Sequence, residues 1–450
     1  MLLTGVVLTV RMLFVQIRGF AHGVAIASGR YDDPDHQGQL THFQALSAAL
    51  SATIGIGNIA GVAIAIYYGG PGAVFWMWVS AFFGMAIKYS ECTLAIMYRK
   101  IDPDGNVRGG PMYYIEMGLG RRFKPLAWMF AICTAIAAFG AGNMVQSNTM
   151  AHSLVDALQI SPESQGAFRL AIGFVVAALV GSVIIGGIKR IGHVASYLVP
   201  IMSIVYVVSA LVILAINADQ IIPAFELIFY HAVNPTAVVG GSASGVTVWM
   251  TISWGLRRGL FSNEAGQGSA AMAHSTAKVE EPVREGLVAM LGPFIDTIVI
   301  CSMTGLVIVT SGAWASGQTG AVLTMDAFNA ALPVYGRWMV VVGVILFAFS
   351  TVIAWSYYGE KGIEYVAGDK AKLPYKWLYI VFTLLGAWLD LEAVWSYADT
   401  ANGLMAVPNL IALVGLSGAV VMVTRKYMAE KARGLHVPYA QRTKQPVRGS

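Results

Sequence analysis

The chain has 450 residues, of which 56% are hydrophobic and only 12% are charged. Soluble domains normally carry about twice that charged fraction, and apolar runs of about 20 residues, long enough to cross a bilayer, recur from one end of the chain to the other. These numbers exclude an ordinary soluble protein and predict an all-α polytopic membrane protein. The three cysteines, Cys92, Cys133 and Cys301, lie in apolar segments, which argues against a disulfide framework.

The apolar pattern predicts about eleven transmembrane helices. In chain order they cover residues 2–20, 47–68, 74–97, 126–150, 168–188, 194–216, 246–275, 286–311, 337–358, 376–393 and 404–424. The first segment lacks the basic start and the small-residue cleavage site of a signal peptide, so we retain it as a helix.

The basic residues predict the orientation. The net charge is +5, and all but five of the 29 Lys and Arg residues fall on one side of the predicted spans. The positive-inside rule places that side, and the C-terminal tail, in the cytoplasm. With an odd number of spans, the N-terminus is then expected outside.

Glycines interrupt the second predicted span within the stretch SATIGIGNIAGVA, residues 51–63. The spacing of Gly55, Gly57 and Gly61 does not match a dinucleotide fingerprint, and no βαβ unit surrounds it. Close helix packing is one explanation, because Gly57 and Gly61 form a G-x-x-x-G pair. A break in the helix is the other.

A second interruption favours the break. Residues 259–269, GLFSNEAGQGS, contain three glycines and the polar side chains of Ser262, Asn263, Glu264 and Gln267 inside an apolar span. Non-helical backbone is tolerated at membrane depth only where it is buried in protein or lines a cavity. Two interrupted spans at matching places in two halves indicate a transporter binding site. Counted from the second span, they are the first and sixth of ten, which predicts a 5+5 inverted repeat preceded by one peripheral helix.

Each break would expose N–H groups at one half-helix end and C=O groups at the other. The N–H end favours a carboxylate, and the C=O end favours Na⁺ or an ammonium group. A zwitterion together with a small cation would satisfy both. The predicted substrate-binding residues at the breaks are Gly55, Ile56, Gly57, Phe261, Ser262 and Asn263, and the side-chain oxygen of Asn58 is a candidate cation ligand.

Several long motifs resemble those of the alanine or glycine:cation symporter family. They are GIGNIAGVAIAIYYGGPGAVFWMW, RGGPMYYIEMGLG, GNMVQSN, WGLRRGLFSNEAGQGSAAMAH, PFIDTIVICSMT and YYGEK, and they span nearly the whole chain. The resemblance implies a leucine-transporter-type fold in a prokaryotic plasma (inner) membrane. It also implies Na⁺-coupled import of small neutral amino acids such as alanine and glycine, without an organic cofactor. Ile56 departs from the family, in which many members carry Thr.

The resemblance also suggests site residues outside the breaks. Gln146 is expected to contact the substrate, whereas Asn143, one turn away, is expected to join helices. Trp355, on the same helix face as Thr351, either walls the pocket or only packs. The Na⁺ site is expected between the first break and the ninth span, at Ser51, Ile54, Ser350 and Thr351, in addition to Asn58.

Charged residues within the spans require partners. Lys88 and Glu91 are three residues apart on one helix and are predicted to pair. Asp296 is either a cation ligand or, slightly favoured, the partner of Arg257 or Arg258. Glu264, inside the second break, is expected to brace the half-helices.

The predicted organisation comprises an N-terminal helix and cytoplasmic linker (1–45), a first repeat (46–217), an extracellular connection (218–245), a second repeat (246–427) and a cytoplasmic tail (428–450). The predicted function is Na⁺-coupled amino-acid symport by alternating access, not catalysis. An H⁺-coupled symporter stays open as an alternative. An intramembrane hydrolase is disfavoured because Asp296 has no second aspartate at depth and no G-x-S-x-G motif occurs. A passive channel is disfavoured because polar residues gather at two breaks rather than along stripes.

Overall fold

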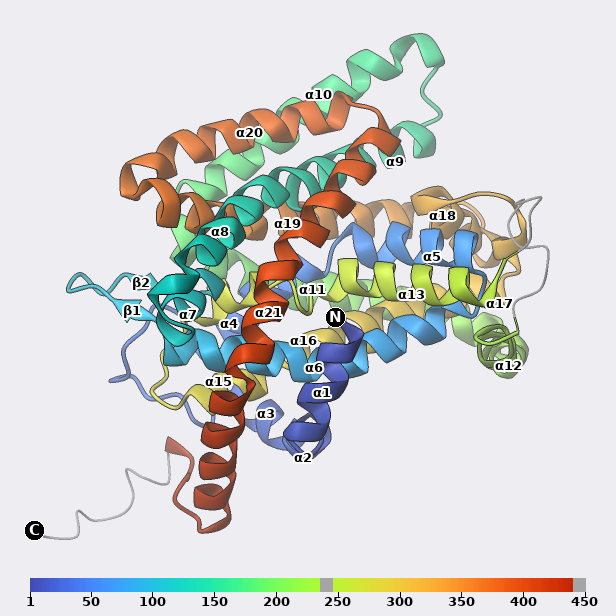
Figure 1. Ribbon diagram of the computed structural model, residues 1–450. Helices are drawn as coiled ribbons and strands as arrows, with labels where there is room; N and C mark the ends of the chain where they lie inside the picture. Colours follow the sequence, from blue (N-terminus) through green and yellow to red (C-terminus); the bar gives the residue numbers. More distant parts are fainter. Residues whose placement is uncertain (235–245, 440–450) are drawn as a thin grey trace, which may run out of the picture.

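The computed structural model describes residues 1–234 and 246–439, so the end of the predicted 218–245 connection and the last part of the tail lie outside the described residues. The described chain is almost entirely helical (Figure 1). Its one sheet pairs two short strands, β1 (Lys100–Ile101) and β2 (Val107–Arg108), in a loop.

Eight helices of the described chain form the body of the bundle. They are α6 (Ala73–Met97), α8 (Lys124–Phe139), α9 (Val145–Ala157), α10 (Pro162–Ile184), α11 (Gly187–Ile216), α19 (Tyr335–Ala367), α20 (Lys372–Trp388) and α21 (Leu391–Ala432). Shorter elements complete it: α7 (Pro111–Gly118), α12 (Ile221–His231), α15 (Pro282–Ala289), α16 (Leu291–Pro293), α17 (Ser302–Thr310) and α18 (Gly320–Ala331).

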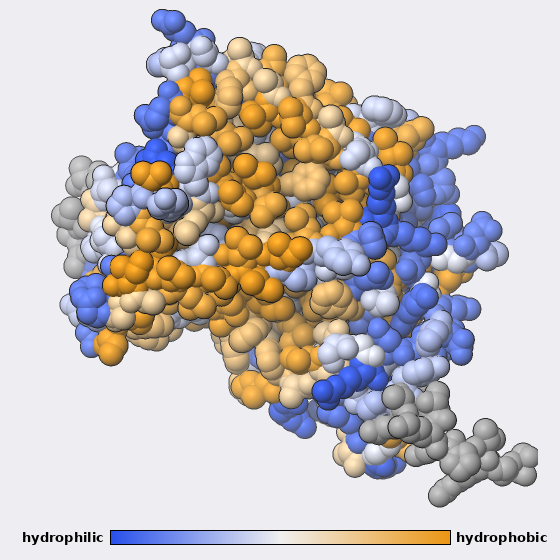
Figure 2. Space-filling view, turned by 180° about the vertical axis from the view of Figure 1, so that it is seen from behind, coloured by the Kyte–Doolittle hydropathy of each residue, from blue (hydrophilic) through white to orange (hydrophobic). Residues whose placement is uncertain are grey.

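Length and composition show the transmembrane character. Among the described residues, six helices are long and apolar enough to cross a membrane, or seven if the bent pair His42–Thr53 and Gly57–Gly69 counts as one span. Figure 2 shows a broad hydrophobic surface, with hydrophilic residues gathered mainly at one end. The protein is therefore a multi-pass, all-helical membrane protein.

Two spans are broken where the glycines predict it. The first consists of α4 (His42–Thr53), a π-helical turn η1 (Gly57–Gly61) and α5 (Val62–Gly69), with a bend of 54°. The second consists of α13 (Val248–Asn263) and α14 (Ser269–His274). Both pack against α6, and α4 also packs against α19.

Side-chain caps begin these broken spans. Thr41 and Gln44 form a capping box at the start of α4, each side chain accepting a hydrogen bond from the other's backbone N–H, at 3.2 and 3.1 Å. Thr247 caps α13 by accepting from the Met250 N–H at 3.2 Å. The half-helices therefore start at positions set by local sequence.

The prediction of one continuous helix over 2–20 is wrong. The chain forms α1 (Leu2–Arg11), α2 (Val15–Arg18) and α3 (Phe20–Ala27) instead. Leu13 and Phe14 adopt positive φ values of 54° and 55°, which interrupts the helix between α1 and α2. Ten residues span about 15 Å, so α1 cannot cross a bilayer. The expected outside location of the N-terminus depended on that crossing and loses its basis.

Candidate substrate and cation site

The first break lies against α19 and α13 with almost no spare space. A Cβ on Gly55 would come within 2.4 Å of the Thr351 hydroxyl, and a Cβ on Gly57 within 3.1 Å of the Ser262 Cα. Gly61 is different, because the atoms nearest its Cβ position are 3.9 Å away or farther. Close approach therefore explains the glycines at the break itself, whereas the G-x-x-x-G contact predicted from Gly61 is loose.

Side-chain amides satisfy part of the interrupted backbone. The Gly55 N–H donates to Asn58 Oδ1 at 2.8 Å, and the Ile56 N–H donates to Gln146 Oε1 at 3.1 Å. The Gly57 N–H makes no hydrogen bond to any residue in the described part of the chain. One backbone donor at the break thus stays available to a ligand.

Oxygen atoms of the first break and α19 form a compact cluster. The Ser350 hydroxyl lies 3.2 Å from the Ser51 carbonyl and 3.3 Å from the Ile54 carbonyl. The Thr351 hydroxyl lies 3.1 Å from the Ser51 carbonyl and 3.4 Å from the Ile54 carbonyl. The Ser51 hydroxyl donates back to the Ser350 carbonyl at 2.8 Å.

This cluster has the donor set of a hard-cation site. Each hydroxyl carries a single proton, so Ser350 and Thr351 cannot donate to all the carbonyl oxygens around them, and lone pairs remain. Neutral hydroxyl and carbonyl oxygens are ligands that hard cations prefer. The four residues Ser51, Ile54, Ser350 and Thr351, predicted from the sequence as ion ligands, are brought together here.

Asn58 occupies a different position. Its amide nitrogen donates to the Asp296 carboxylate at 2.7 Å and to the Asp296 carbonyl at 3.1 Å, while its oxygen holds the Gly55 N–H. None of its hydrogen bonds reaches the hydroxyl–carbonyl cluster. Asn58 therefore connects the first break to the π-helical segment η5 (Phe294–Cys301).

Asp296 has partners that the sequence analysis did not anticipate. Its carboxylate accepts hydrogen bonds from Asn58, from the Ser262 hydroxyl at 2.8 Å and from the Thr297 hydroxyl at 2.6 Å. The predicted pairing of Asp296 with Arg257 or Arg258 is wrong. The carboxylate joins the two breaks through neutral donors instead.

The second break is closed by carboxylates. Glu91 Oε1 accepts from the Gly266 N–H at 3.0 Å, the Gly268 N–H at 3.1 Å and the Asn409 amide at 2.7 Å. The predicted Lys88–Glu91 pair is therefore wrong, since Glu91 is directed at backbone and amide donors. Gly266 and Gly268 have φ values of 90° and 78°, which favour glycine.

Glu264 braces this break as predicted. Its carboxylate accepts from the Trp355 indole N–H at 2.7 Å and from the Ser269 hydroxyl at 2.5 Å. Ser269 is the first residue of α14, so the contact joins the two half-helices through one side chain.

A small cavity of about 10 Å³ lies between the two breaks. Six predicted residues line it: Gly55, Gly57, Gln146, Phe261, Thr351 and Trp355. Five more residues line it that the sequence analysis did not select as site residues: Ala52, Thr53, Ala141, Glu264 and Asn402. Three predicted substrate residues, Ile56, Ser262 and Asn263, do not line it.

These three residues have structural contacts. The Ile56 side chain is fully buried, and Ser262 binds Asp296. Asn263 lies within 3.4 Å of the Ser80 and Thr297 hydroxyls. Asn402 was missed because the predicted span began two residues later, although an amide beside an apolar run was a usable signal. Its Oδ1 is buried and has no hydrogen-bond partner among the described residues.

The predicted helix-joining role of Asn143 fits its contact, a hydrogen bond from its amide to the Tyr379 carbonyl at 2.7 Å. Gln146 combines both kinds of contact. Its amide nitrogen donates to the Ala141 carbonyl at 2.8 Å, and its oxygen holds the first break.

Contacts close the bundle on both sides of this cavity. On one side, Arg258 of α13 pairs with Asp399 of α21, and three aromatic rings lie within 5.5 Å of its guanidinium carbon: Trp254, Phe261 and Trp395. On the other side, the Glu285 carboxylate lies 2.5 Å from both His42 Nδ1 and His274 Nδ1. These histidines belong to α4 and α14, one on each broken span.

Comparison with known proteins identifies the family. The model of the sodium:alanine symporter family matches residues 1–441. The chain belongs to this family. It is therefore a secondary transporter and not an enzyme.

Related proteins match this chain over most of their lengths. This symporter is 47% identical to the sodium/alanine symporter AgcS of Methanococcus maripaludis over 430 residues, covering 94% of this chain and 92% of the relative. It is 34% identical to the probable sodium/glutamine symporter GlnT of Bacillus subtilis, covering 95% and 85%. The crystal structure of MhsT in complex with L-phenylalanine aligns with a TM-score of 0.59 at 13% identity, covering 86% of this chain and 98% of that one. This last likeness shows a shared fold.

Proposed function

We propose that this symporter couples inward Na⁺ movement to the uptake of alanine or glycine. The observation that carries the proposal is the adjacency of two sites at the first break. The Ser51–Ile54–Ser350–Thr351 oxygen cluster lies on one side of Thr351, and the small cavity lies on the other. A cation and a small zwitterion would therefore bind within the reach of one side chain.

The substrate carboxylate is assigned to the N–H end of the first break. The Gly57 N–H is available there, and Gln146 lies beside it. Phe261 and Trp355 would wall the apolar side chain of the substrate; the cavity holds only about 10 Å³ here, so it would have to widen to admit an amino acid. The unpartnered Oδ1 of Asn402 is a candidate acceptor for the substrate ammonium.

Alternating access supplies the mechanism. The ten spans predicted from residue 47 to residue 424 would form two five-helix inverted repeats, with the N-terminal helices at the periphery. The bundle that carries both breaks would rock around the fixed cavity. The distribution of basic residues supports a cytoplasmic C-terminus in a prokaryotic plasma membrane; in that orientation Arg258–Asp399 would close the outer side and His42–Glu285–His274 the inner side.

Reconstituted uptake tests the coupling. Purified protein in proteoliposomes is given radiolabelled alanine under an inward gradient of Na⁺, of K⁺, or of H⁺ alone. We expect accumulation only with Na⁺. Accumulation driven by the H⁺ gradient without Na⁺ would instead establish the H⁺-coupled alternative, and equal uptake with K⁺ would reject ion coupling at the oxygen cluster.

A further inference from the structure

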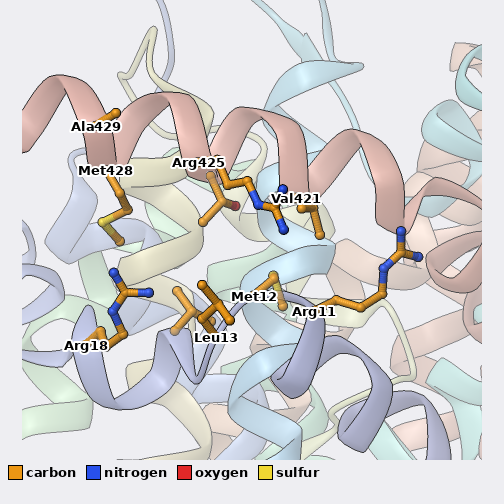
Figure 3. Close-up of a pocket in the computed structure, with 10 residues that line it drawn as sticks. Arg11, Met12, Leu13, Arg18, Val421, Arg425, Met428 and Ala429 are labelled. Carbon is orange, nitrogen blue, oxygen red and sulfur yellow. The ribbon is translucent and has the colours of Figure 1, made fainter.

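A second cavity, of about 290 Å³, lies between the α1–α2 turn and the C-terminal part of α21 (Figure 3). It shares no lining residue with the cavity between the breaks. Its walls are formed by Arg11, Met12, Leu13, Val15, Arg18, Val421, Thr424, Arg425, Met428 and Ala429. The cavity thus combines three guanidinium groups with a mostly apolar lining.

The three guanidinium groups have no acidic counterpart. Within residues 1–234 and 246–439, Arg11, Arg18 and Arg425 have no carboxylate within 4.0 Å. Arg11 crosses the cavity edge to donate a hydrogen bond to the Ser417 hydroxyl of α21, which fixes its direction. Glu430, the next acidic residue along α21, is contacted by two other basic side chains. Figure 3 shows Arg11 and Arg18 at opposite ends of the cavity with Arg425 between them, so three positive charges lie along one hollow without neutralisation.

The surface beside the cavity is apolar and exposed. Leu13, in the α1–α2 turn, is 56% exposed, and Ile17, in α2 next to Arg18, is 63% exposed. Exposed apolar side chains next to a cationic pocket suit a ligand that has both an anionic group and hydrocarbon. A soluble anion without hydrocarbon would make no contact with these apolar side chains.

The cavity lies on the side of the bundle that carries most basic residues. Gly19, next to Arg18, contacts Leu287 and Met290, close to the Glu285 contact with the two histidines. By the positive-inside rule, this side faces the cytoplasm. The cytoplasmic leaflet contains anionic phospholipids, and basic pockets between helices on that side bind their head groups.

We propose that this cavity binds the phosphate of an anionic phospholipid. Arg425, which lies between the other two along the cavity, would donate paired hydrogen bonds to the phosphate oxygens, as planar guanidinium groups do, and Arg11 and Arg18, at opposite ends of the cavity (Figure 3), would attract its charge. The acyl chains would lie along the exposed apolar face of α1 and α2. The lipid would thereby join the N-terminal helices to α21.

Lipid binding to the purified full-length protein tests this directly. In zwitterionic detergent, titration with phosphatidylglycerol is followed by native mass spectrometry and by the melting temperature, with phosphatidylcholine as the neutral comparison. We expect phosphatidylglycerol to bind and to raise the melting temperature, and phosphatidylcholine to do neither. Each arginine-to-glutamine change should weaken binding about fivefold, and the triple change about 100-fold.

Two controls keep the test decisive. Lys426→Gln removes an equal charge from the same turn of α21 but does not line the cavity, so lipid binding should be unchanged. The triple Arg→Lys variant keeps the charge and should bind better than the triple glutamine variant if both fold. Equal phosphatidylglycerol binding by the parent and the triple glutamine variant would overturn the proposal. Displacement of the lipid by millimolar inorganic phosphate with the same stabilisation would overturn the assignment to a lipid.

Discussion

The two broken spans solve the same problem with different groups. At the second break, the Glu91 carboxylate and the Asn409 amide hold the interrupted backbone, and the Glu264 carboxylate accepts from the Ser269 hydroxyl. At the first break, only neutral hydroxyls and amides do so, and the Gly57 N–H has no partner in the described chain. The carboxylates hold the second break through several hydrogen bonds at once, whereas the neutral partners of the first break can exchange contacts with a cation and a substrate.

The largest expected effect is a loss of stability when the Glu91 carboxylate is removed from the second break. Glu91→Ala leaves two backbone N–H groups and the Asn409 amide without their acceptor, at a cost of about 1–3 kcal/mol for each buried donor left unsatisfied. We expect a lower melting temperature and a broadened elution profile in detergent. Glu91→Gln keeps one acceptor oxygen, so its melting temperature should lie between those of Glu91→Ala and the parent.

An unchanged melting temperature for Glu91→Ala would contradict the division between the two breaks. It would mean that the glycines alone hold the second one.

Gly57→Ala tests whether the first break binds substrate. The added Cβ would lie 3.1–3.2 Å from the Ser262 Cα and the Phe261 ring, on the substrate side of the break. We expect about tenfold weaker alanine binding, or roughly 1.4 kcal/mol, by calorimetric titration of protein that elutes as one sharp species. Parent-like binding would assign Gly57 to packing alone.

The hydroxyl cluster predicts a selective effect on the ion. Ser350→Ala and Thr351→Ala each remove one oxygen, which should weaken apparent Na⁺ affinity about fivefold, or about 1 kcal/mol, with a smaller change in maximal uptake. Ser356→Ala is the matched control, because that buried hydroxyl bonds only to the Ile353 carbonyl of its own helix. A loss of maximal uptake without a shift in Na⁺ dependence would place the cation elsewhere.

The smallest expected effect concerns Gly61. Its Cβ position is 3.9 Å from the Ile56 carbonyl oxygen and 4.0 Å from the Arg258 Cδ, and alanine favours a helix by about 1 kcal/mol over glycine. Gly61→Ala should therefore bind alanine as the parent does and melt at the same temperature or slightly higher. A loss comparable with that of Gly57→Ala would restore the packing explanation for both glycines.

The sequence predicted the features that arise within one segment or in one family pattern. The positions of both breaks follow from glycines and polar residues in apolar spans, and the grouping of Ser51 and Ile54 with Ser350 and Thr351 follows from the fold that the family shares. The partners of Glu91 and Asp296 could not be predicted in this way. Glu91 lies three residues from Lys88 along the chain, but the packing of α6 against α14 directs it to the second break.

Backbone conformation and helix boundaries were the other features that the sequence did not predict. Positive φ values at Leu13 and Phe14 divide the first apolar run, although neither residue type favours them. Asn402 lines the cavity because helix α21 begins at Leu391, well before the apolar run from which the span was predicted. Both the interruption of the first helix and the position of Asn402 depend on tertiary packing, which a single sequence does not reveal directly.

Helix α19 places Ser350, Thr351 and Trp355 within six residues of each other. At 1.5 Å per residue, Thr351 and Trp355 are about 6 Å apart along one unbroken helix, and Trp355 in turn holds Glu264 at the second break. On the proposed assignment, the ion ligands and the substrate wall are parts of a single stiff lever. A shift of this lever on Na⁺ arrival would reposition both halves of the substrate site at once, without a relay of intermediate residues.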